Sequence, residues 1–189
     1  MVCTALLATM TANAFIRLLT AADAPAYKTL HDTVLHSAPE AFVSDLASAL
    51  ARPAQAYVQR FGGVPSGRFF LGAFAHNDDP APLLGCVGCE RALYPQQRHS
   101  GELVGLMVAP PAQRQGLGWA LLQQCLTLAA QVPGLEQLQL SVQAGNAHAI
   151  RLYERAGFTA WGREPRALRV GCAYHDKVHM MRLLYPTGP

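Results

Sequence analysis

The chain lacks the features that mark several large classes of protein. None of its apolar runs approaches the length needed to cross a bilayer. Charged residues make up only 14% of the 189 residues, and the 15 lysines and arginines are scattered, which argues against disorder and against a nucleic-acid-binding surface. The five cysteines are odd in number and irregularly spaced, so they do not form the pattern of a disulfide framework. We therefore expect a globular cytoplasmic protein with reduced thiols and with neither nucleic-acid nor membrane partners.

Metal-ligand spacing is missing as well. Cys86 and Cys89 form a C-x-x-C pair, but the pair lies in an apolar, strand-like run and no second pair accompanies it. Packing in a buried strand is the favoured interpretation, and metal binding or redox use is the alternative. His99, His175 and His179 show no metal-ligand spacing among themselves, so no metal is expected.

The N-terminal segment weakly imitates a signal peptide. Residues 1–14 contain a short apolar stretch that closes with Ala12-Asn13-Ala14, but they have no basic n-region. We therefore expect a flexible lead-in over residues 1–14, or a start at Met10, followed by a single domain over residues 15–185.

The order of the expected elements indicates a mixed sheet. Strands are expected at Phe15–Leu19, Phe69–Ala75, Leu83–Ala92, Gly101–Ala109, Gln137–Gln143, Phe158–Arg163 and Lys177–Leu184. Helices are expected at Pro25–Ser37, Ser44–Arg60 and Gln113–Gln131, and directly after Asn146. The strand–helix–strand unit from Gly101 to Gln143 implies one parallel strand pair. The predicted fold class is α/β (α+β), with a mixed, mainly antiparallel sheet, a central parallel strand pair and flanking helices.

The segment Val108–Gly118 falls where a strand gives way to a helix. The unpaired N–H groups and the positive dipole end of a helix start form an anion site. Gly116 and Gly118 have no Cβ, so that phosphates can approach the backbone, and Arg114 adds a guanidinium. The third glycine of a dinucleotide fingerprint and the Gly-Lys-Ser/Thr of a Walker loop are both missing. Taken alone, the segment predicts an anion site, and a helix start without a ligand is the alternative.

Two motifs together resemble those of the GNAT (Gcn5-related N-acetyltransferase) superfamily. Val108–Gly118 matches Val-x-Pro-x-x-(Gln/Arg)-x-x-Gly-x-Gly, with Gln113 at the variable first cationic position. Asn146–Phe158 matches Asn-x-x-Ala-x-x-Leu-Tyr-x-x-x-Gly-Phe about thirty residues further on. The resemblance extends over roughly Phe15 to Leu184 and implies a GNAT fold with acetyl-CoA as co-substrate.

The resemblance also implies which residues hold coenzyme A. Backbone amides of one loop would bind the pyrophosphate, and this loop consists of Gln113, Arg114, Gln115, Gly116, Leu117 and Gly118. The backbone of Met107 and Val108 would pair with the pantetheine arm. Asn146 would cap its helix in any case, with a cofactor contact as a second role.

Two side chains are candidates for proton transfer in the reaction that the resemblance implies. The phenol of Tyr153 would protonate the departing sulfur as general acid, and the alternative is a ring that packs in the core with a structural hydrogen bond. Glu102 would abstract the proton of the amine as general base. It shares strand parity with Val104, Leu106 and Val108 and would therefore point into the same cleft. The alternative is a solvated glutamate at the beginning of a strand.

The expected function is that of an acetyl-CoA-dependent N-acetyltransferase, which transfers an acetyl group to a primary amine by direct attack on the thioester. A small molecule, an amino acid and a protein amine all remain open as acceptors. Tyr27, Phe42 and Tyr57 lie where the family builds its acceptor pocket, although core packing is favoured for each. A non-catalytic GNAT-fold module that binds or senses acyl-CoA is the alternative, and a homodimer is compatible with either.

Overall fold

The strands form one mixed sheet in the order β1-β2-β3-β4-β5-β6-β8-β7. The structure is a computed structural model and describes residues 9–11, 14–42, 45–76 and 81–184. Only β5 and β6 are parallel among the pairs of the described strands, which confirms the predicted fold class. The strands are β1 (Thr9–Thr11), β2 (Ala14–Leu18), β3 (Arg68–Phe74), β4 (Leu83–Arg91), β5 (Ser100–Val108), β6 (Gln137–Gln143), β7 (Thr159–Val170) and β8 (Ala173–Leu183).

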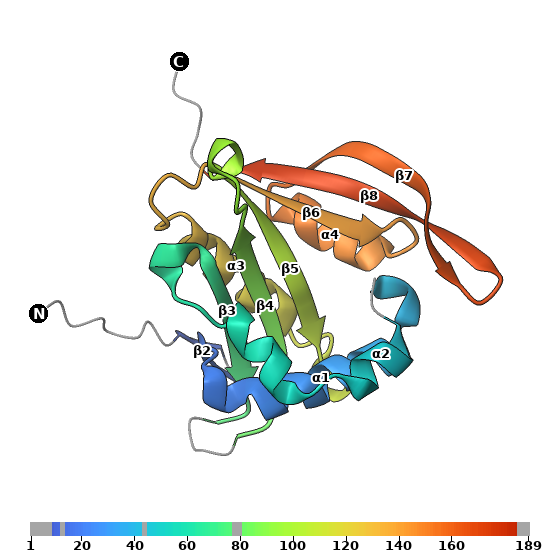
Figure 1. Cartoon of the computed structure of the whole chain (residues 1–189), viewed down its shortest axis with the longest axis horizontal. Helices are drawn as coiled ribbons and strands as arrows, with labels where there is room; N and C mark the ends of the chain where they lie inside the picture. Colours follow the sequence, from blue (N-terminus) through green and yellow to red (C-terminus); the bar gives the residue numbers. More distant parts are fainter. Residues whose placement is uncertain (1–8, 12–13, 43–44, 77–80, 185–189) are drawn as a thin grey trace, which may run out of the picture.

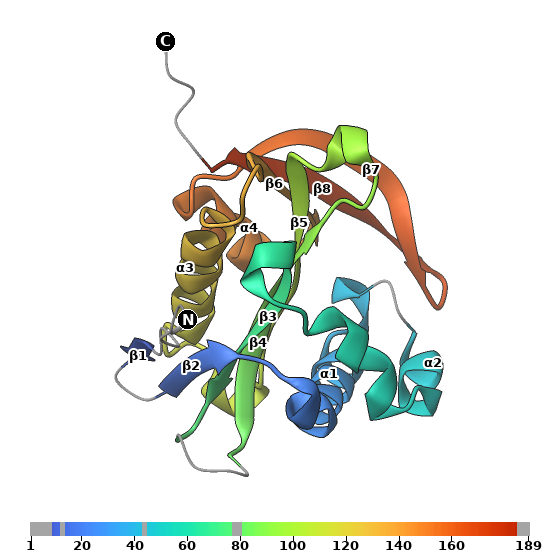
Figure 2. The same cartoon turned by 60° about the vertical axis from the view of Figure 1, so that its left-hand side comes forward.

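Helices cover both faces of the sheet (Figures 1 and 2). On one face lie α1 (Ala24–Ser37), α2 (Leu46–Ala51) and the 3₁₀ helix η3 (Ala54–Arg60). On the other face lie α3 (Leu117–Ala129) and α4 (Ala147–Arg155). Because successive strand residues point to opposite faces, the sheet supplies two separate hydrophobic cores. The α1-side core contains Tyr27, Leu30, Phe70, Phe74, Cys86 and Met107, and the α3-side core contains Phe69, Leu71, Val87, Cys89, Leu103, Leu121 and Cys125.

The C-x-x-C pair is divided between these two cores. Cys86 packs in the α1-side core and Cys89 in the α3-side core, and both are free thiols. Burial raises the pKa of each thiol to about 12, so neither forms a reactive thiolate at neutral pH. The packing interpretation of the pair is therefore confirmed.

The N-terminal segment contributes a strand that the sequence pattern did not indicate. Residues 9–11, expected to belong to a flexible lead-in, form β1 and pair with β2, with Thr11 opposite Ala14. Ala14, the last residue of the expected lead-in, begins β2. Residues 1–8 and 12–13 lie outside the described part of the chain.

The helix expected over Ser44–Arg60 is divided in two. Asp45 caps α2, with its Oδ1 atom accepting a hydrogen bond from the Ser48 N–H group at 2.9 Å. Arg52 then adopts an extended conformation with ψ 125°, because the ring of Pro53 disfavours helical geometry in the residue before it. The chain resumes as the 3₁₀ helix η3, so a short α-helix and a 3₁₀ helix replace the single helix that was predicted. Ser44 itself lies outside the described residues.

The C-terminal hairpin is longer than expected. Its strands were expected over Phe158–Arg163 and Lys177–Leu184, but β7 and β8 run on until Val170 pairs with Ala173. Four of the seven missed residues of β7 are exposed, and only Leu168 and Val170 alternate with a polar residue, so the pattern indicates a strand only weakly. Arg163 and Asp176 connect the two strands through an ion pair of 2.8 Å.

Candidate active site

The site begins where the parallel strands separate. Pairing between β5 and β6 is recorded only at their beginnings, from Ser100 opposite Gln137 to Glu102 opposite Gln139. Beyond these pairs β5 continues to Val108 while β6 runs in a different direction (Figure 1). The two strands therefore open a gap in the centre of the sheet.

A bulge in β5 accompanies this separation. Val104 lies opposite Gly88 and Met107 opposite Cys86, so β5 has one residue more than β4 between these pairs. Gly105 sits in the bulge with φ 59°, and a Cβ atom there would come within 3.3 Å of the Phe70 ring. Backbone conformation and packing thus both favour glycine at this position.

The bulge overturns the predicted parity of Glu102. Val104 and Met107 contact the α1-side core, whereas Leu106 and Val108 contact the α3-side core. Glu102 therefore shares its face with Val104 but not with Leu106 or Val108. Alternation counted along an ideal strand fails at the inserted residue.

Met107 and Val108 were both expected to present their backbone to the pantetheine arm, but only Val108 presents its backbone to the gap. The N–H group of Ala109 donates to the Leu84 carbonyl oxygen at 2.8 Å, and Met107 faces Cys86 on the same edge. Because peptide groups alternate between the two edges of a strand, those of Val108 point away from β4 and toward the gap. The Val108 carbonyl accepts a hydrogen bond of 3.1 Å from Gln113 Nε2. Met107 is directed to β4, with its side chain buried.

The loop after β5 delays the start of α3. The helix was expected from Gln113 but begins at Leu117, after the short 3₁₀ helix of Pro110–Ala112. Arg114 with φ 62° and Gly116 with φ 78° are left-handed, which is incompatible with a continuous right-handed helix. Gln113, Arg114, Gln115 and Gly116 therefore form an exposed loop that leads into the helix.

The start of α3 has the properties of an anion site. No side chain caps the helix at Gly116, and the first intrahelical bond runs from the Ala120 N–H group to the Gly116 carbonyl at 3.0 Å. The N–H groups of Leu117, Gly118 and Trp119 are therefore left without helical acceptors. They lie at the positive end of a 13-residue helix.

The glycines of the loop fit a phosphate-bearing cofactor. A Cβ atom at Gly116 would have no neighbour within 4 Å, so the loop leaves open space at this point. A Cβ atom at Gly118 would meet Val108 at 3.7 Å and Leu152 at 3.9 Å, which are ordinary contacts. The packing of the protein therefore does not require glycine at position 118. Close approach of a ligand to the backbone supplies a reason for it.

Helix α4 brings the second motif to the same region. The predicted cap is confirmed, because Asn146 Oδ1 accepts a hydrogen bond of 3.0 Å from the Ala149 N–H group. Tyr153 is buried, and its ring packs edge-on against Phe158 with 5.9 Å between the ring centres. In the described part of the chain, no hydrogen bond engages its hydroxyl. Burial raises the pKa of Tyr153 to about 12, so the phenol keeps its proton at neutral pH.

Glu102 lies on the α1 side of the sheet, close to a second carboxylate. The residue is exposed and lies opposite Glu90 of β4. Partial desolvation raises the pKa of Glu102, and the charge of Glu90 raises it further. The group is thus a stronger base than an ordinary surface glutamate.

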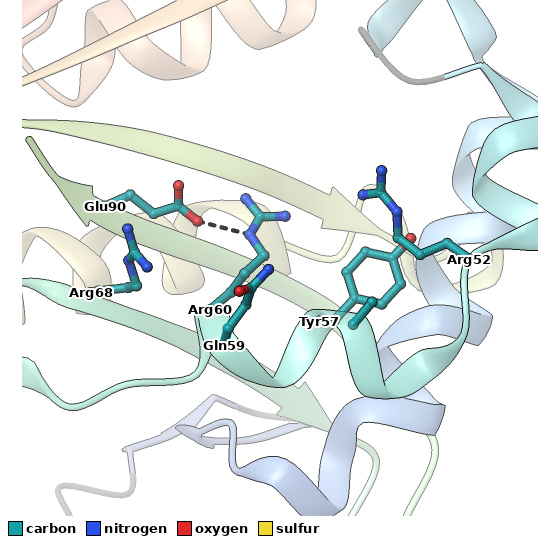
Figure 3. A pocket seen from close by; sticks show the side chains of 7 residues that line it. Arg52, Tyr57, Gln59, Arg60, Arg68 and Glu90 are labelled. Carbon is teal, nitrogen blue, oxygen red and sulfur yellow. Dashed lines mark hydrogen bonds and ion pairs between the residues drawn. The ribbon is translucent and has the colours of Figure 1, made fainter. Parts of the chain in front are cut away.

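A pocket next to these carboxylates was missed by the sequence analysis. It has a volume of about 320 Å³ and is shown in Figure 3. It is lined by Arg52, Ala56, Tyr57, Gln59, Arg60, Arg68 and Glu90. These residues come from η3 and its approach, from β3 and from β4, so no sequence spacing unites them. They meet only when the strands pair.

The aromatic residues that were considered for the acceptor pocket mostly pack together. Tyr27 is buried, with its ring centre 5.1 Å from that of Tyr57. Phe42 packs against this group from the partly buried fringe of the α1-side core. Core packing, the favoured interpretation, is confirmed for Tyr27. Tyr57 packs in the core and also lines the pocket.

Among the described residues, no group of three or more His, Cys, Asp or Glu side chains could hold a metal ion. No helix of the same residues is long and apolar enough to span a membrane.

The comparison with protein families is decisive. The model of the acetyltransferase (GNAT) family matches residues 32–158, which is more than half of the chain. The chain belongs to this family. Solved structures with the same fold include a GNAT-family acetyltransferase from Streptococcus pneumoniae, with a TM-score of 0.78, 22% identity, and coverage of 90% of this chain and 98% of that one.

Two more relatives are informative about ligands. The protein yncA of Salmonella typhimurium, solved with its cofactor acetyl-CoA, superposes with a TM-score of 0.71 at 23% identity and covers 94% of this chain and 98% of its own. A mycothiol acetyltransferase of Salinispora tropica is 38% identical over 84 residues, 44% of this chain. This match spans only 27% of that protein's length.

Proposed function

We propose that this GNAT acetyltransferase is an N-acetyltransferase that transfers the acetyl group of acetyl-CoA to a primary amine. The observation that carries the proposal is the gap between β5 and β6, with the uncapped start of α3 at one side. Val108 directs its backbone toward this gap, and Glu102 lies where the strands separate. The family has been established by the match over residues 32–158, whereas the chemistry of the acceptor is inferred from these groups.

The donor would be held by backbone groups on the α3 side. The N–H groups of Leu117, Gly118 and Trp119 would bind the pyrophosphate together with the loop Gln113–Gly116, and the Arg114 guanidinium would add charge. Val108 would hydrogen-bond to the pantetheine arm as a neighbouring strand does, once Gln113 Nε2 releases its carbonyl. Met107 is left out of this role because it faces β4. Asn146, exposed at the start of α4, would contact the cofactor through its free amide group.

Three proton transfers would complete the reaction, because the nitrogen loses two protons and the sulfur gains one. Acetyl-CoA supplies a thioester whose carbonyl carbon accepts the amine nitrogen, so that a C–N bond forms and the C–S bond breaks. Glu102 would take a proton from the incoming ammonium through water, since its raised pKa favours accepting it. Tyr153 would donate its proton to the departing sulfur, since no hydrogen bond engages its hydroxyl among the described residues, and its phenolate would take up the second proton that the nitrogen releases as the amide forms.

Incubation of the purified chain with acetyl-CoA, a thiol reporter and a panel of primary amines tests the proposal. We expect thermal stabilisation by CoA and thiol release that depends on the amine. Stabilisation by CoA without amine-dependent release over a broad panel would favour an acyl-CoA-binding module. No stabilisation by CoA would contradict both functions.

A further inference from the structure

We infer that the acceptor is a small amino acid, whose carboxylate binds the guanidiniums of the pocket while its amine faces Glu102. This inference rests on the proposed function and names the class of its acceptor. The pocket is defined above by its seven lining residues (Figure 3).

The pocket carries an excess of positive charge. Its lining contains three guanidiniums, those of Arg52, Arg60 and Arg68, and a single carboxylate, that of Glu90, which gives a net charge of three minus one, or +2. In a chain whose total formal charge is +3, such a concentration is notable. An anionic group is the ligand that this lining would attract.

The three guanidiniums are not equally available to a ligand. Arg60 is held by Glu90, with 2.8 Å between Nε and Oε1, and its NH1 group donates to the Tyr27 hydroxyl at 3.1 Å. Arg52 has no ion pair within the described chain, and its guanidinium lies 5.7 Å from the centre of the Tyr57 ring. Arg68 likewise forms no ion pair with any described carboxylate. Arg52 and Arg68 therefore remain as ligands for a carboxylate.

The register of the strands places this charge beside the proposed base. Arg68 of β3 lies directly opposite Glu90 of β4, and Glu90 lies directly opposite Glu102 of β5. Side chains of directly opposite residues share one face of the sheet and are close neighbours. This row of side chains across β3, β4 and β5 is therefore cationic at one end, at Arg68, and anionic at the other, at Glu90 and Glu102. A molecule with a carboxylate and an ammonium group matches this order.

The size and polarity of the pocket fit a small molecule. Its volume of about 320 Å³ falls at the lower end of the range of roughly 300–1,000 Å³ for ligand pockets. Tyr57 lines the pocket, and its buried hydroxyl makes no hydrogen bond within the described structure. A buried hydroxyl without a partner gains from a polar ligand atom that reaches it. Together with the positive charge of the lining, these features favour a small amino acid over an alkylamine that has no carboxylate.

Matched acceptors and charge variants test the inference. Steady-state acetylation is measured for several amino acids and for their carboxamides, which keep the amine and lack the carboxylate. We expect the wild-type ratio of kcat/KM, acid over amide, to fall about tenfold in Arg52→Gln and in Arg68→Gln. The comparison of ratios between proteins cancels the difference in intrinsic nucleophilicity of the two amines. Arg98→Gln, an exposed arginine outside the pocket, is the matched control and should leave the ratio unchanged.

Two results would overturn the inference. An equal ratio in wild type, Arg52→Gln and Arg68→Gln, with amines still acetylated, would reject the pocket and leave the proposed function intact. If nothing is acetylated, the proposed function fails, and calorimetric binding of the same amino acids to the CoA-loaded protein decides the pocket separately. Binding that weakens about tenfold in either variant supports the pocket, and absence of binding to wild type rejects it.

Discussion

The two sides of the sheet differ in how the site is built. On the α3 side, the proposed donor site consists of one continuous loop and a helix start, Gln113–Trp119, whose backbone does the binding. On the α1 side, the proposed acceptor pocket consists of side chains from three elements, among them Arg52, Arg68 and Glu90. Backbone groups recognise what every member of a family must bind, whereas side chains can change without disturbing the chain path. Specificity for the acceptor should therefore depend on the side chains of the α1 side.

The largest expected effect lies on the donor side of this comparison. Tyr153→Phe removes only the hydroxyl, and we expect kcat to fall about 100-fold or more because the sulfur then departs without a proton donor. The Kd for CoA should change by less than about threefold, since the ring remains packed against Phe158. Steady-state kinetics and calorimetry measure the two quantities. Tyr94→Phe, at an exposed tyrosine, is the control, and equal rates in wild type and Tyr153→Phe would remove this residue from the chemistry.

The next largest effect concerns Glu102, on the α1 side of the sheet where β5 and β6 separate. Glu102→Gln should lower kcat/KM about 10- to 100-fold through the loss of the base. A base acts only when deprotonated, and the pKa of Glu102 is raised, so the wild-type rate should fall as the pH drops through this raised value. The pH profile of kcat/KM should lose this acidic limb in Glu102→Gln but keep it in Glu136→Gln, an exposed control. A limb that persists in Glu102→Gln would assign the base elsewhere.

A glycine of the donor loop separates binding from folding. In Gly118→Ala the new Cβ atom would make only ordinary contacts with Val108 and Leu152, so the free energy of unfolding should stay equal or rise by up to about 1 kcal/mol. CoA should nevertheless bind about fivefold to tenfold more weakly, because the methyl group keeps the phosphates from the backbone. Chemical denaturation measures the free energy of unfolding, and calorimetry measures the affinity for CoA. Unchanged CoA affinity would show that the cofactor does not approach this residue.

The smallest effect is expected in the acceptor pocket. Tyr57→Phe removes a buried hydroxyl that has no partner among the described residues, so the free energy of unfolding should change by less than about 0.5 kcal/mol. If the hydroxyl made a structural hydrogen bond, its removal would lower the free energy of unfolding by about 1 kcal/mol or more. Thermal or urea unfolding decides between the two. A clear loss of stability would show that the hydroxyl is already engaged without ligand.

Sequence patterns indicated the proposed donor side because its signals are local. The spacing of Gly116 and Gly118 and the Asn146 cap are properties of short segments, and the structure confirms the change from strand to helix and the cap. The start of α3 was expected four residues too early, since the left-handed conformation of Arg114 leaves no mark in a pattern of apolar residues. The parity of Glu102 failed for a comparable reason. A single inserted residue in β5 exchanges the two faces.

The acceptor side could not be predicted in the same way. Arg52, Arg60, Arg68 and Glu90 stand at unrelated spacings, and only the pairing of β3 with β4 and the position of η3 bring them together. Pro53 is the one local signal on this side, because a proline disfavours helical geometry in the residue before it and so predicts the break between α2 and η3. A cluster of charged side chains that forms only when distant segments pack together has no fixed spacing in the sequence by which to predict it.

Hydrogen–deuterium exchange can distinguish a ligand on the α3 side of the sheet from a ligand on the α1 side. With CoA alone, we predict slower exchange at the amides of Val108 and Leu117–Trp119 and unchanged exchange over η3. Addition of an amino acid to the CoA-loaded protein should then slow exchange in η3 and in the segment that leads into β3. Protection of η3 by CoA alone, or a loop at Gln113–Gly118 that stays unprotected when CoA is bound, would contradict the division of the site into a donor side and an acceptor side.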